Sequence, residues 1–222
     1  MRSFEEILDI AAERKGDRAI VLDGIEPPLS ADELAAIPDD RWLAQMTKAV
    51  FQAGFSWKVI ETKWPGFETA FFSFDVDRAA FMAPDWFDEL VGDTRIVRNA
   101  MKIRSVHENA MLVQQTSREV GGFGRKIADW PGTDFAGLLR WLAKNGSRMG
   151  GTSAQYFLRS MGKDSFILSR DVVGRLVAEG VIDKPPTSQK AMASVQSAFN
   201  TWTAESGQSL KVVSRVLAQS TG

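Results

Sequence analysis

The chain has 222 residues, 44% hydrophobic and 25% charged, which is enough for a substantial core and excludes a disordered or fibrous protein. Lys and Arg total 27 and Asp and Glu total 28, and the net charge of −1 argues against a nucleic-acid binder. With no cysteine and one histidine, disulfides, a thiolate nucleophile and a multi-histidine metal site are excluded. The chain has no long apolar run and its first residues lack the apolar stretch of a signal peptide, so we expect a soluble, cytoplasmic protein.

Helical periodicity and capping residues predict four helices in the first third of the chain, over about 4–16, 30–38, 40–52 and 57–63. Ser30 and Glu33 form a capping box for the second helix, and Asp39 or Asp40 caps the third. Ser56 is expected to cap the fourth helix, which Trp64-Pro65-Gly66 should break.

Seven more helices are predicted at about 85–91, 98–118, 134–145, 151–161, 169–179, 188–205 and 209–219. Pro84 takes the first position of the first of these, and the loop Gly121-Gly122-Phe123-Gly124 ends the second. Lys184-Pro185-Pro186 is the clearest linker. Strand signals are confined to 18–22 and 165–168, so the predicted fold class is all-α.

The charged residues are distributed unevenly along the chain, so the net charge of −1 hides an acidic and a basic segment. Residues 1–40 hold four basic groups against eleven acids, a balance of −7. Residues 140–175 hold seven basic groups against two acids, a balance of +5, and this basic stretch surrounds a short turn between two helices. A charge run is usually a solvated face, but this placement also suits an anion-binding turn.

Adjacent glycines before a helix allow backbone N–H groups to approach a phosphate, and the helix presents its positive N-terminus. Here Met149-Gly150-Gly151 would supply the N–H groups, Thr152 and Ser153 hydroxyl donors, and Lys144 and Arg148 positive charge. The alternative is a helix hairpin that uses its glycines only to turn.

Gln52-Ala53-Gly54-Phe55-Ser56-Trp57 resembles the Gln-Ala-Gly-Leu-Ser-Trp signature of the 3-methyladenine DNA glycosylase I family. The resemblance covers roughly residues 41–162 and continues in register through Phe71, Phe74-Asp75, Arg78, Ile96-Val97-Arg98, Lys102-Ile103, Lys144-Asn145-Gly146 and Gly151-Thr152-Ser153. It implies a helix-hairpin-helix DNA glycosylase with two helical lobes around a cleft. Such an enzyme grips double-stranded DNA by the hairpin, flips out a damaged base and cleaves its N-glycosidic bond.

The resemblance also implies an organisation for the chain. We expect a single glycosylase-like domain over 1–222, with a divergent N-terminal extension at 1–40 and a glycosylase core at 41–183. The hairpin lies near 146–151, and C-terminal helices occupy 187–222. The expected partner is double-stranded DNA with a damaged base; we expect a monomer with no cofactor, no metal and no membrane partner.

The resemblance makes Trp57 the candidate platform for the flipped base, with Phe55 and Gln52 nearby. A 3-methylated adenine is cationic, and an indole face attracts a cation by about 0.5–2 kcal/mol. The alternative is that Trp57 is an ordinary core ring. Trp42 and Trp141 lie on apolar helical stripes and are expected in the core.

Trp64 and Trp130 each precede a Pro-Gly pair and are expected in loops, and His107 is expected at the surface or half-buried.

This chain departs from the family pattern in two places. The family's structural zinc is bound by Cys and His residues that are missing here. The family's base-recognising glutamate stands three residues before the Gln-Ala-Gly triplet, where this chain has Ala49. The preference for 3-methyladenine itself is therefore open.

The segment after the hairpin resembles the one that carries the catalytic aspartate in other members of the superfamily, and Asp171 matches that aspartate best. A shift of one residue would put Arg170 there, and the alternative role for Asp171 is a carboxylate at a helix N-terminus. No lysine stands inside the second hairpin helix, since Lys163 comes just after it, so the resemblance implies a monofunctional enzyme. The competing hypotheses are a non-catalytic DNA-binding or damage-recognition module and, less favoured, a helical interaction protein unrelated to DNA.

Overall fold

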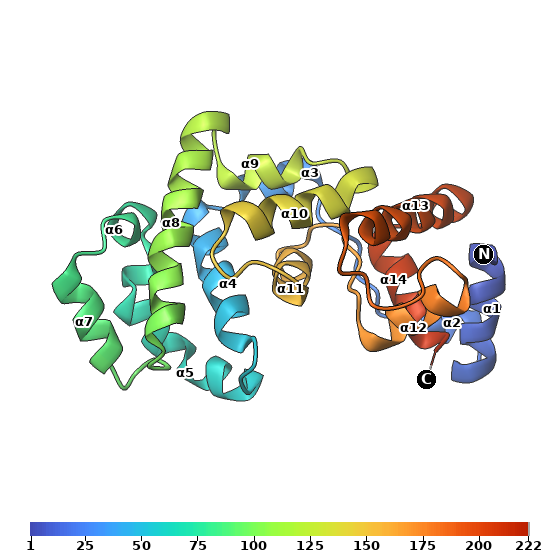
Figure 1. Cartoon of the computed structure of the whole chain (residues 1–222), viewed down its shortest axis with the longest axis horizontal. Coiled ribbons are helices and arrows are strands. Elements are labelled where there is room, and N and C mark those ends of the chain that lie inside the picture. Colours follow the sequence, from blue (N-terminus) through green and yellow to red (C-terminus); the bar gives the residue numbers. More distant parts are fainter. Residues whose placement is uncertain (222) are drawn as a thin grey trace. The chain divides into compact units, whose positions relative to one another are not determined.

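The computed structural model describes residues 1–221, and within them the regular structure consists of α-helices and two short 3-10 helices, with no strand (Figure 1). The predicted all-α class is confirmed. The strand expected at 18–22 is wrong, because Asp17 accepts a hydrogen bond from the Ile20 N–H and starts helix α2, Arg18–Leu22. The strand expected at 165–168 is also wrong, since that segment has no regular structure.

The chain forms two compact units, each assembled from separate stretches of sequence. Unit 1 contains residues 1–29, 131–137 and the chain from Gly162 onward; unit 2 contains 30–130 and 138–161. The Lys184-Pro185-Pro186 linker lies within unit 1, between α12 and α13. The subdivision of the chain at 40 and 183 stays a prediction.

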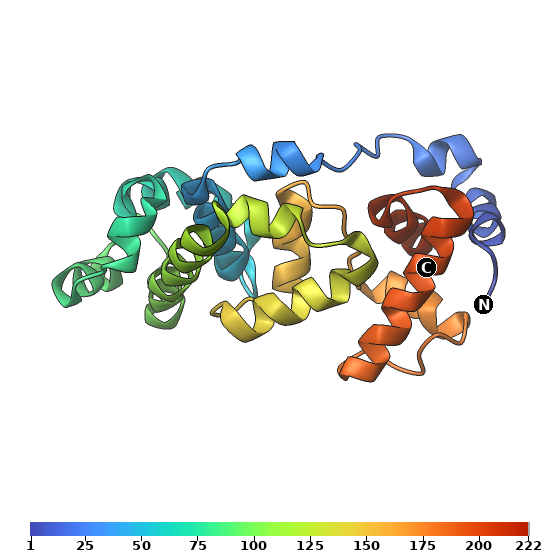
Figure 2. The same ribbon diagram turned by 90° about the horizontal axis from the view of Figure 1, so that it is seen from above.

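Unit 1 brings together the two ends of the sequence (Figure 2). Its helices are α1 (Phe4–Lys15), α2, α12 (Arg170–Ala178), α13 (Gln189–Ser206) and α14 (Leu210–Gln219), with the short helix η2 (Gly132–Asp134). Helix α1 packs against α2, α13 and α14. Its start is the capping box of Ser3 and Glu6, and it ends at Gly16, whose φ of 121° suits glycine.

A buried ion network holds these ends together. Glu179 accepts hydrogen bonds from the Arg2 backbone N–H at 2.8 Å and the Arg2 guanidinium at 2.9 Å, and forms an ion pair with Arg175 at 3.2 Å. Arg175 also donates to the Ser220 hydroxyl at 2.8 Å. Burial opposes ionisation of Glu179, but the hydrogen bonds from Arg2 and Arg175 outweigh it, so the pKa of this carboxyl is lowered.

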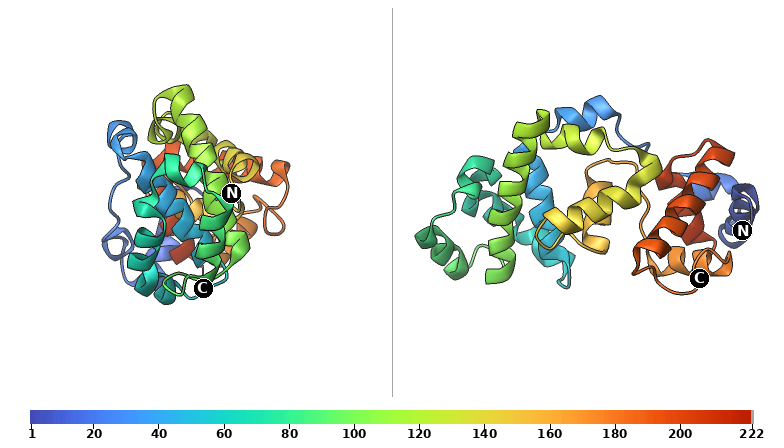
Figure 3. Two further views of the ribbon diagram at one scale, coloured as in Figure 1. Left: turned by 90° about the vertical axis from the view of Figure 1, so that its left-hand side faces the viewer. Right: turned by 45° about the horizontal axis from the view of Figure 1, so that its top comes forward.

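Unit 2 is built around α8 (Ala100–Val120), which packs against α4, α6, α7 and α9 (Figure 1). The other elements are α3 (Ala31–Ala36), α4 (Asp39–Gln52), α5 (Trp57–Ala70), η1 (Phe72–Phe74), α6 (Val76–Ala80), α7 (Pro84–Gly92), α9 (Phe123–Ala128) and α11 (Thr152–Ser160). Helix α10 (Phe135–Asn145) begins in unit 1 and continues in unit 2. Further views of these helices are given in Figure 3.

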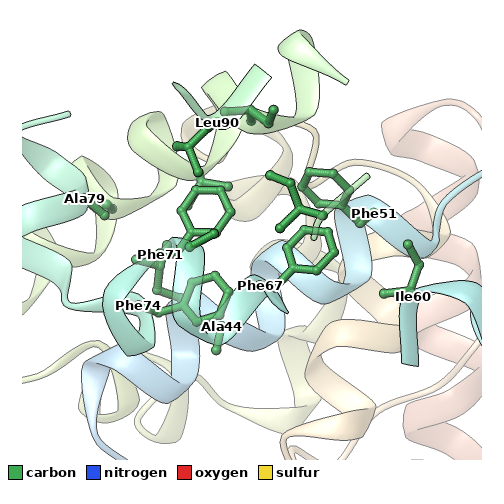
Figure 4. Packing of buried hydrophobic residues seen from close by; sticks show 14 residues of the cluster. Ala44, Phe51, Ile60, Phe67, Phe71, Phe74, Ala79 and Leu90 are labelled. Carbon is green, nitrogen blue, oxygen red and sulfur yellow. The ribbon is translucent and has the colours of Figure 1, made fainter. Parts of the chain in front are cut away.

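An aromatic cluster forms the core of unit 2. Phe51, Phe67, Phe71 and Phe74 are fully buried in it, and Figure 4 shows their rings gathered between the helices. Phe51 and Phe67 meet edge to face with centroids 4.7 Å apart, and Phe71 stacks on Phe74 at 5.4 Å. Such contacts add about 0.5–1.5 kcal/mol each beyond the burial of apolar area.

The break predicted at Trp64-Pro65-Gly66 is wrong, because α5 runs through it to Ala70. Trp64 is therefore helical and stacks on Phe67 and Phe74, each at 5.4 Å. An interior proline costs a helix about 3 kcal/mol, and the buried aromatic side chains that follow offset this cost. Gly66 has a packing role, since a Cβ there would lie 2.5 Å from the Arg95 carbonyl oxygen.

Two predictions about the region around Asp39 are corrected. Pro38, not an aspartate, occupies the N-cap of α4, and Asp39 instead accepts hydrogen bonds from the Phe123 N–H at 2.9 Å and from Ser117. That bond helps to start α9 at Phe123, so only Gly121 and Gly122 form the loop that was expected at 121–124.

The remaining aromatic predictions are mostly confirmed. Trp42 is fully buried between Phe123 and Phe157, while Trp141 is only half-buried. His107 is half-buried, with Nδ1 3.0 Å from the Ala79 carbonyl oxygen. Within residues 1–221 no helix is both long enough and apolar enough to cross a membrane.

Candidate nucleic-acid interface

The predicted hairpin exists: the end of α10 leads through a turn at 146–151 into α11. The turn is tight at its start, because a Cβ on Gly146 would lie 2.9 Å from both the Leu142 carbonyl oxygen and the Met149 side chain. Met149 is fully buried and anchors the turn. Gly151 has φ 59° and ψ −136°, a conformation that only glycine adopts readily, so its role is conformational.

Asn109 holds this turn against α8. It is fully buried, its Nδ2 donates to the Ser147 carbonyl oxygen at 3.1 Å, and its Oδ1 accepts from the Ser147 N–H at 2.8 Å. Both backbone groups of one turn residue are thus satisfied by a single rigid side chain. No sequence motif indicates the role of Asn109, because its partner lies 38 residues away along the chain.

The residues predicted to bind DNA gather at the surface of this hairpin. Lys144, Arg148, Gly150, Gly151 and Thr152 are exposed, and Ser153 is half-buried. No side chain caps the N-terminus of α11. The turn therefore presents two cationic side chains, two hydroxyls and the positive end of a helix on one short stretch of chain, which is the donor set that a phosphate needs.

The residues predicted to bind the base lie at and after the end of α4. Gln52 is its last residue and half-buried; Phe55 and Trp57 are 45% and 51% exposed. Ser56 occupies the N-cap of α5 as predicted, although its side chain makes no capping bond. The exposure of Trp57 contradicts the alternative that it is a core ring.

Tyr156 of α11 brings the hairpin next to Trp57. The two rings are perpendicular, at 89°, with centroids 5.4 Å apart. Tyr156 is 37% exposed. The predicted base platform and the helix that starts at the predicted phosphate-binding turn are therefore in direct contact, and Tyr156 is a candidate residue that sequence reasoning missed.

Lys102 supports the same loop from α8. Its Nζ donates to the carbonyl oxygens of Phe51, at 3.2 Å, and Ala53, at 2.8 Å. Burial lowers the pKa of Lys102, and the positive charge of Arg148 lowers it further. The Lys102-Ile103 pair is part of the sequence resemblance, but the role of Lys102 in holding the loop depends on a contact across 51 residues of chain.

The position of the missing family glutamate is closed to solvent, since Ala49 is 6% exposed. A carboxylate is nevertheless nearby: Glu61, one helical turn after Trp57, forms an ion pair with Lys48 at 2.8 Å and accepts a hydrogen bond from Gln52 at 3.3 Å. Lys48, Gln52 and Glu61 thus form a polar cluster beside the residues that were predicted to bind the base.

Asp171 lies in unit 1, whereas the hairpin and Trp57 lie in unit 2. It is exposed in the first turn of α12, whose N-cap Ser169 accepts a hydrogen bond from the Val172 N–H at 3.2 Å. Both roles considered for Asp171 stay open. The zinc ligands of the family are not present: within residues 1–221 no group of three or more His, Cys, Asp or Glu side chains could hold a metal ion.

Known proteins resemble this chain in part of its sequence and in its fold. Residues 36–134 match the family model described as methyladenine glycosylase. The 3-methyladenine DNA glycosylase I from Staphylococcus aureus is similar in structure, with a TM-score of 0.51 and 19% identity over 70% of this chain and 91% of that one. The 8-oxoguanine glycosylase/lyase from Methanocaldococcus jannaschii, solved with DNA containing 8-oxoguanine, has a TM-score of 0.50 and 13% identity over 96% of this chain and 95% of that one. The fold is that of the helical DNA glycosylases.

Proposed function

We propose, because residues 36–134 match the family model of the methyladenine glycosylases, that the chain is a monofunctional DNA glycosylase that excises alkylated purines of the 3-methyladenine type. The observation that carries the proposal is the contact of the exposed Trp57 ring with Tyr156, on the helix that begins at the hairpin turn. Helix α11 starts at the proposed phosphate-binding turn and contacts the exposed Trp57 ring through Tyr156. This arrangement suits an enzyme that binds the DNA backbone and receives an extrahelical base.

In this proposal the hairpin binds the DNA backbone without reading its sequence. Lys144 and Arg148 neutralise phosphates, and the N–H groups at Gly150 and Gly151 approach one phosphate closely because neither residue has a Cβ. Thr152 and Ser153 add hydroxyl donors at the N-terminus of α11. The Asn109 clamp keeps the turn rigid, so little conformational freedom is lost when DNA binds.

The flipped base would lie against Trp57, with Phe55 and Gln52 beside it. Flipping costs a few kcal/mol, least for a damaged base. A cationic alkylated purine recovers part of that cost through attraction to the indole face, worth about 0.5–2 kcal/mol. Ala49 supplies no carboxylate at the position of the family glutamate. Glu61, one turn after Trp57 along α5, supplies one next to Gln52 instead.

The reaction would be hydrolysis of the N-glycosidic bond. A water oxygen bonds to the sugar carbon as the bond to the purine nitrogen breaks, and the bond electrons neutralise the cationic base as it leaves. Asp171 is the proposed carboxylate that stabilises the positively charged sugar and orients the water, which releases its proton to the solvent after it has bonded to the sugar carbon. Helix α11 contains no lysine, in keeping with water rather than an amine as the nucleophile.

The test is to incubate the protein with methylated duplex DNA and to identify released bases by chromatography. We expect free 3-methyladenine, and Trp57→Ala should reduce its rate of release by about tenfold or more if one stacking surface is lost. Asp171→Asn should slow release without weakening binding to undamaged duplex. Full excision by Asp171→Asn would leave that residue only the role of a carboxylate at the N-terminus of α12.

A second candidate is a non-catalytic damage-recognition protein, favoured by the alanine at the position of the family glutamate. Salt-sensitive binding to duplex DNA without release of any base would support it. The absence of duplex binding even at low salt would contradict both candidates.

The double variant Arg148→Glu, Gly151→Val tests the hairpin, and it should weaken binding to duplex DNA under either candidate function. Unaltered binding would contradict the role of the hairpin.

A further inference from the structure

Tyr156 is the one tyrosine of the chain, and its position within α11 is unusual. The large apolar neighbours Phe157 and Leu158 are fully buried, whereas the Tyr156 ring is 37% exposed on the other side of the helix. Phe157 packs against Trp42, at 5.8 Å, and so fixes α11 on the core of unit 2. The core is complete without the Tyr156 ring, which contacts Trp57 at the surface instead.

The geometry of this contact defines a corner. The rings of Trp57 and Tyr156 are perpendicular, at 89°, with centroids 5.4 Å apart. A flat heteroaromatic ring can lie parallel to one of them while its edge meets the other, which combines the two favourable arrangements of aromatic pairs. The Tyr156 hydroxyl adds a hydrogen-bond donor and acceptor to the indole N–H donor of Trp57.

The corner also lies at a fixed distance from the hairpin. Tyr156 lies four residues after Thr152, the first residue of α11, which corresponds to a rise of about 6 Å along the helix. The Asn109 clamp on one side and the Phe157 contact on the other hold this helix in place. A backbone phosphate at the turn would therefore place its own nucleotide within reach of both rings.

We propose that Tyr156 is a base-contacting residue, forming with Trp57 a two-walled site for the extrahelical purine. This inference rests on the proposed glycosylase function and extends it: the same helix that receives the DNA phosphate at its N-terminus receives the flipped base one turn later. Selectivity for a flipped purine then depends on two rings, one from α5 and one from α11.

The test compares Tyr156→Ala and Tyr156→Phe with the unaltered protein in three measurements: single-turnover release of 3-methyladenine from methylated duplex, binding to undamaged duplex, and the urea midpoint of unfolding. Loss of the ring should lower the single-turnover rate about tenfold to hundredfold, as expected for one stacking partner. Binding to undamaged duplex and the unfolding midpoint should stay unchanged. Tyr156→Phe, which keeps the ring, should recover most of the rate.

Phe81→Ala is the matched control, because Phe81 is an aromatic residue of unit 2 that is 85% exposed and outside the proposed site. It should leave all three measurements unchanged. A rate for Tyr156→Ala within twofold of the unaltered protein would overturn the inference and leave the proposed function intact. A parallel loss of rate and of undamaged-duplex binding would overturn it as well, because the ring would then serve the backbone grip. If the unaltered protein releases no base, both the proposed function and this inference fail.

Discussion

The two units of this protein are stabilised in different ways. Unit 1 joins residues from both ends of the sequence, and its Glu179 carboxylate is buried in a network with Arg2 and Arg175. Unit 2 is centred on stacked and edge-to-face aromatic rings, Phe67 and Phe71 among them. The stability of unit 1 should therefore depend on ionisation and that of unit 2 on packing.

Within unit 2, buried aromatic rings also differ from exposed ones. Helix α5 carries Phe67 in the core and Trp57 at its exposed first turn. Both are large aromatic residues of one helix. Phe67 is fully buried among other aromatic rings, whereas about half of the surface of Trp57 is exposed to solvent. An exposed ring next to a cationic hairpin contributes little to the core and is available to a ligand.

The largest effect on stability is expected for Phe67→Ala. This ring is fully buried and meets Phe51 at 4.7 Å and Phe71 at 6.2 Å, so its loss leaves a cavity that cannot collapse. The free energy of unfolding should fall by about 3–5 kcal/mol, measured by urea denaturation. Phe81→Ala, at an exposed position, should change it by less than about 0.5 kcal/mol. Similar losses in the two variants would contradict the packing account of unit 2.

Glu179→Ala should have an effect nearly as large in unit 1. It leaves the buried Arg175 without its carboxylate, and removing one partner of a buried pair costs about 3–5 kcal/mol. Glu5→Ala is the control, because it breaks an exposed ion pair with Arg18 in the same unit and should cost no more than about 1 kcal/mol. An equal loss of unfolding free energy in the two variants would show that burial does not make the Arg175–Glu179 ion pair more important for stability than the exposed Arg18–Glu5 pair.

The pH dependence of stability should follow from the same carboxylate. The folded-state pKa of Glu179 is lowered below the unfolded value, so its ionised form stabilises unit 1 above about pH 4.5, and that contribution is lost as pH falls through the folded pKa. The stability gap between the unaltered protein and Glu179→Gln should thus narrow on acidification from pH 7 to pH 3. If urea denaturation gives the same difference in unfolding free energy from pH 7 to pH 3, the lowered pKa of Glu179 is contradicted.

Asn109→Ala should have a moderate effect, concentrated at the hairpin. Losing both bonds to Ser147 leaves buried backbone groups unpaired, at a cost of about 1–3 kcal/mol. Amide hydrogen exchange should accelerate across 146–151, and affinity for duplex DNA should fall. Asn145→Ala removes a hydrogen bond of the same kind, to the Trp141 carbonyl oxygen, at an exposed position of the same hairpin, and should leave exchange in the turn unchanged.

The smallest change in stability is expected for Trp57→Ala. The ring is 51% exposed, so the free energy of unfolding should fall by no more than about 1 kcal/mol, even though the residue removed is the largest of the series. Thermal unfolding measures this directly. A loss comparable to that of Phe67→Ala would return Trp57 to the core and remove the basis for a surface site.

Much of the site could be predicted because its parts are local in sequence. The glycines and cations of the turn occupy eight consecutive positions, 144–151, and the base-binding candidates occupy six, 52–57. Tyr156 and Asn109 could not be found in this way. The role of Tyr156 depends on its contact with Trp57, and the role of Asn109 depends on its hydrogen bonds to Ser147. In both pairs the residues are distant along the chain and near in space.

The amino-acid sequence by itself determined where most helices begin and end, because a cap is a contact between a side chain and a backbone group three residues away. Ser30, Ser169, Ser188 and Ser209 each cap the helix that was predicted to follow. Tertiary structure alone decided that α5 continues through Pro65 and that Trp57 meets Tyr156. These outcomes depend on packing energies between distant segments, which exceed local propensities of about 1–3 kcal/mol.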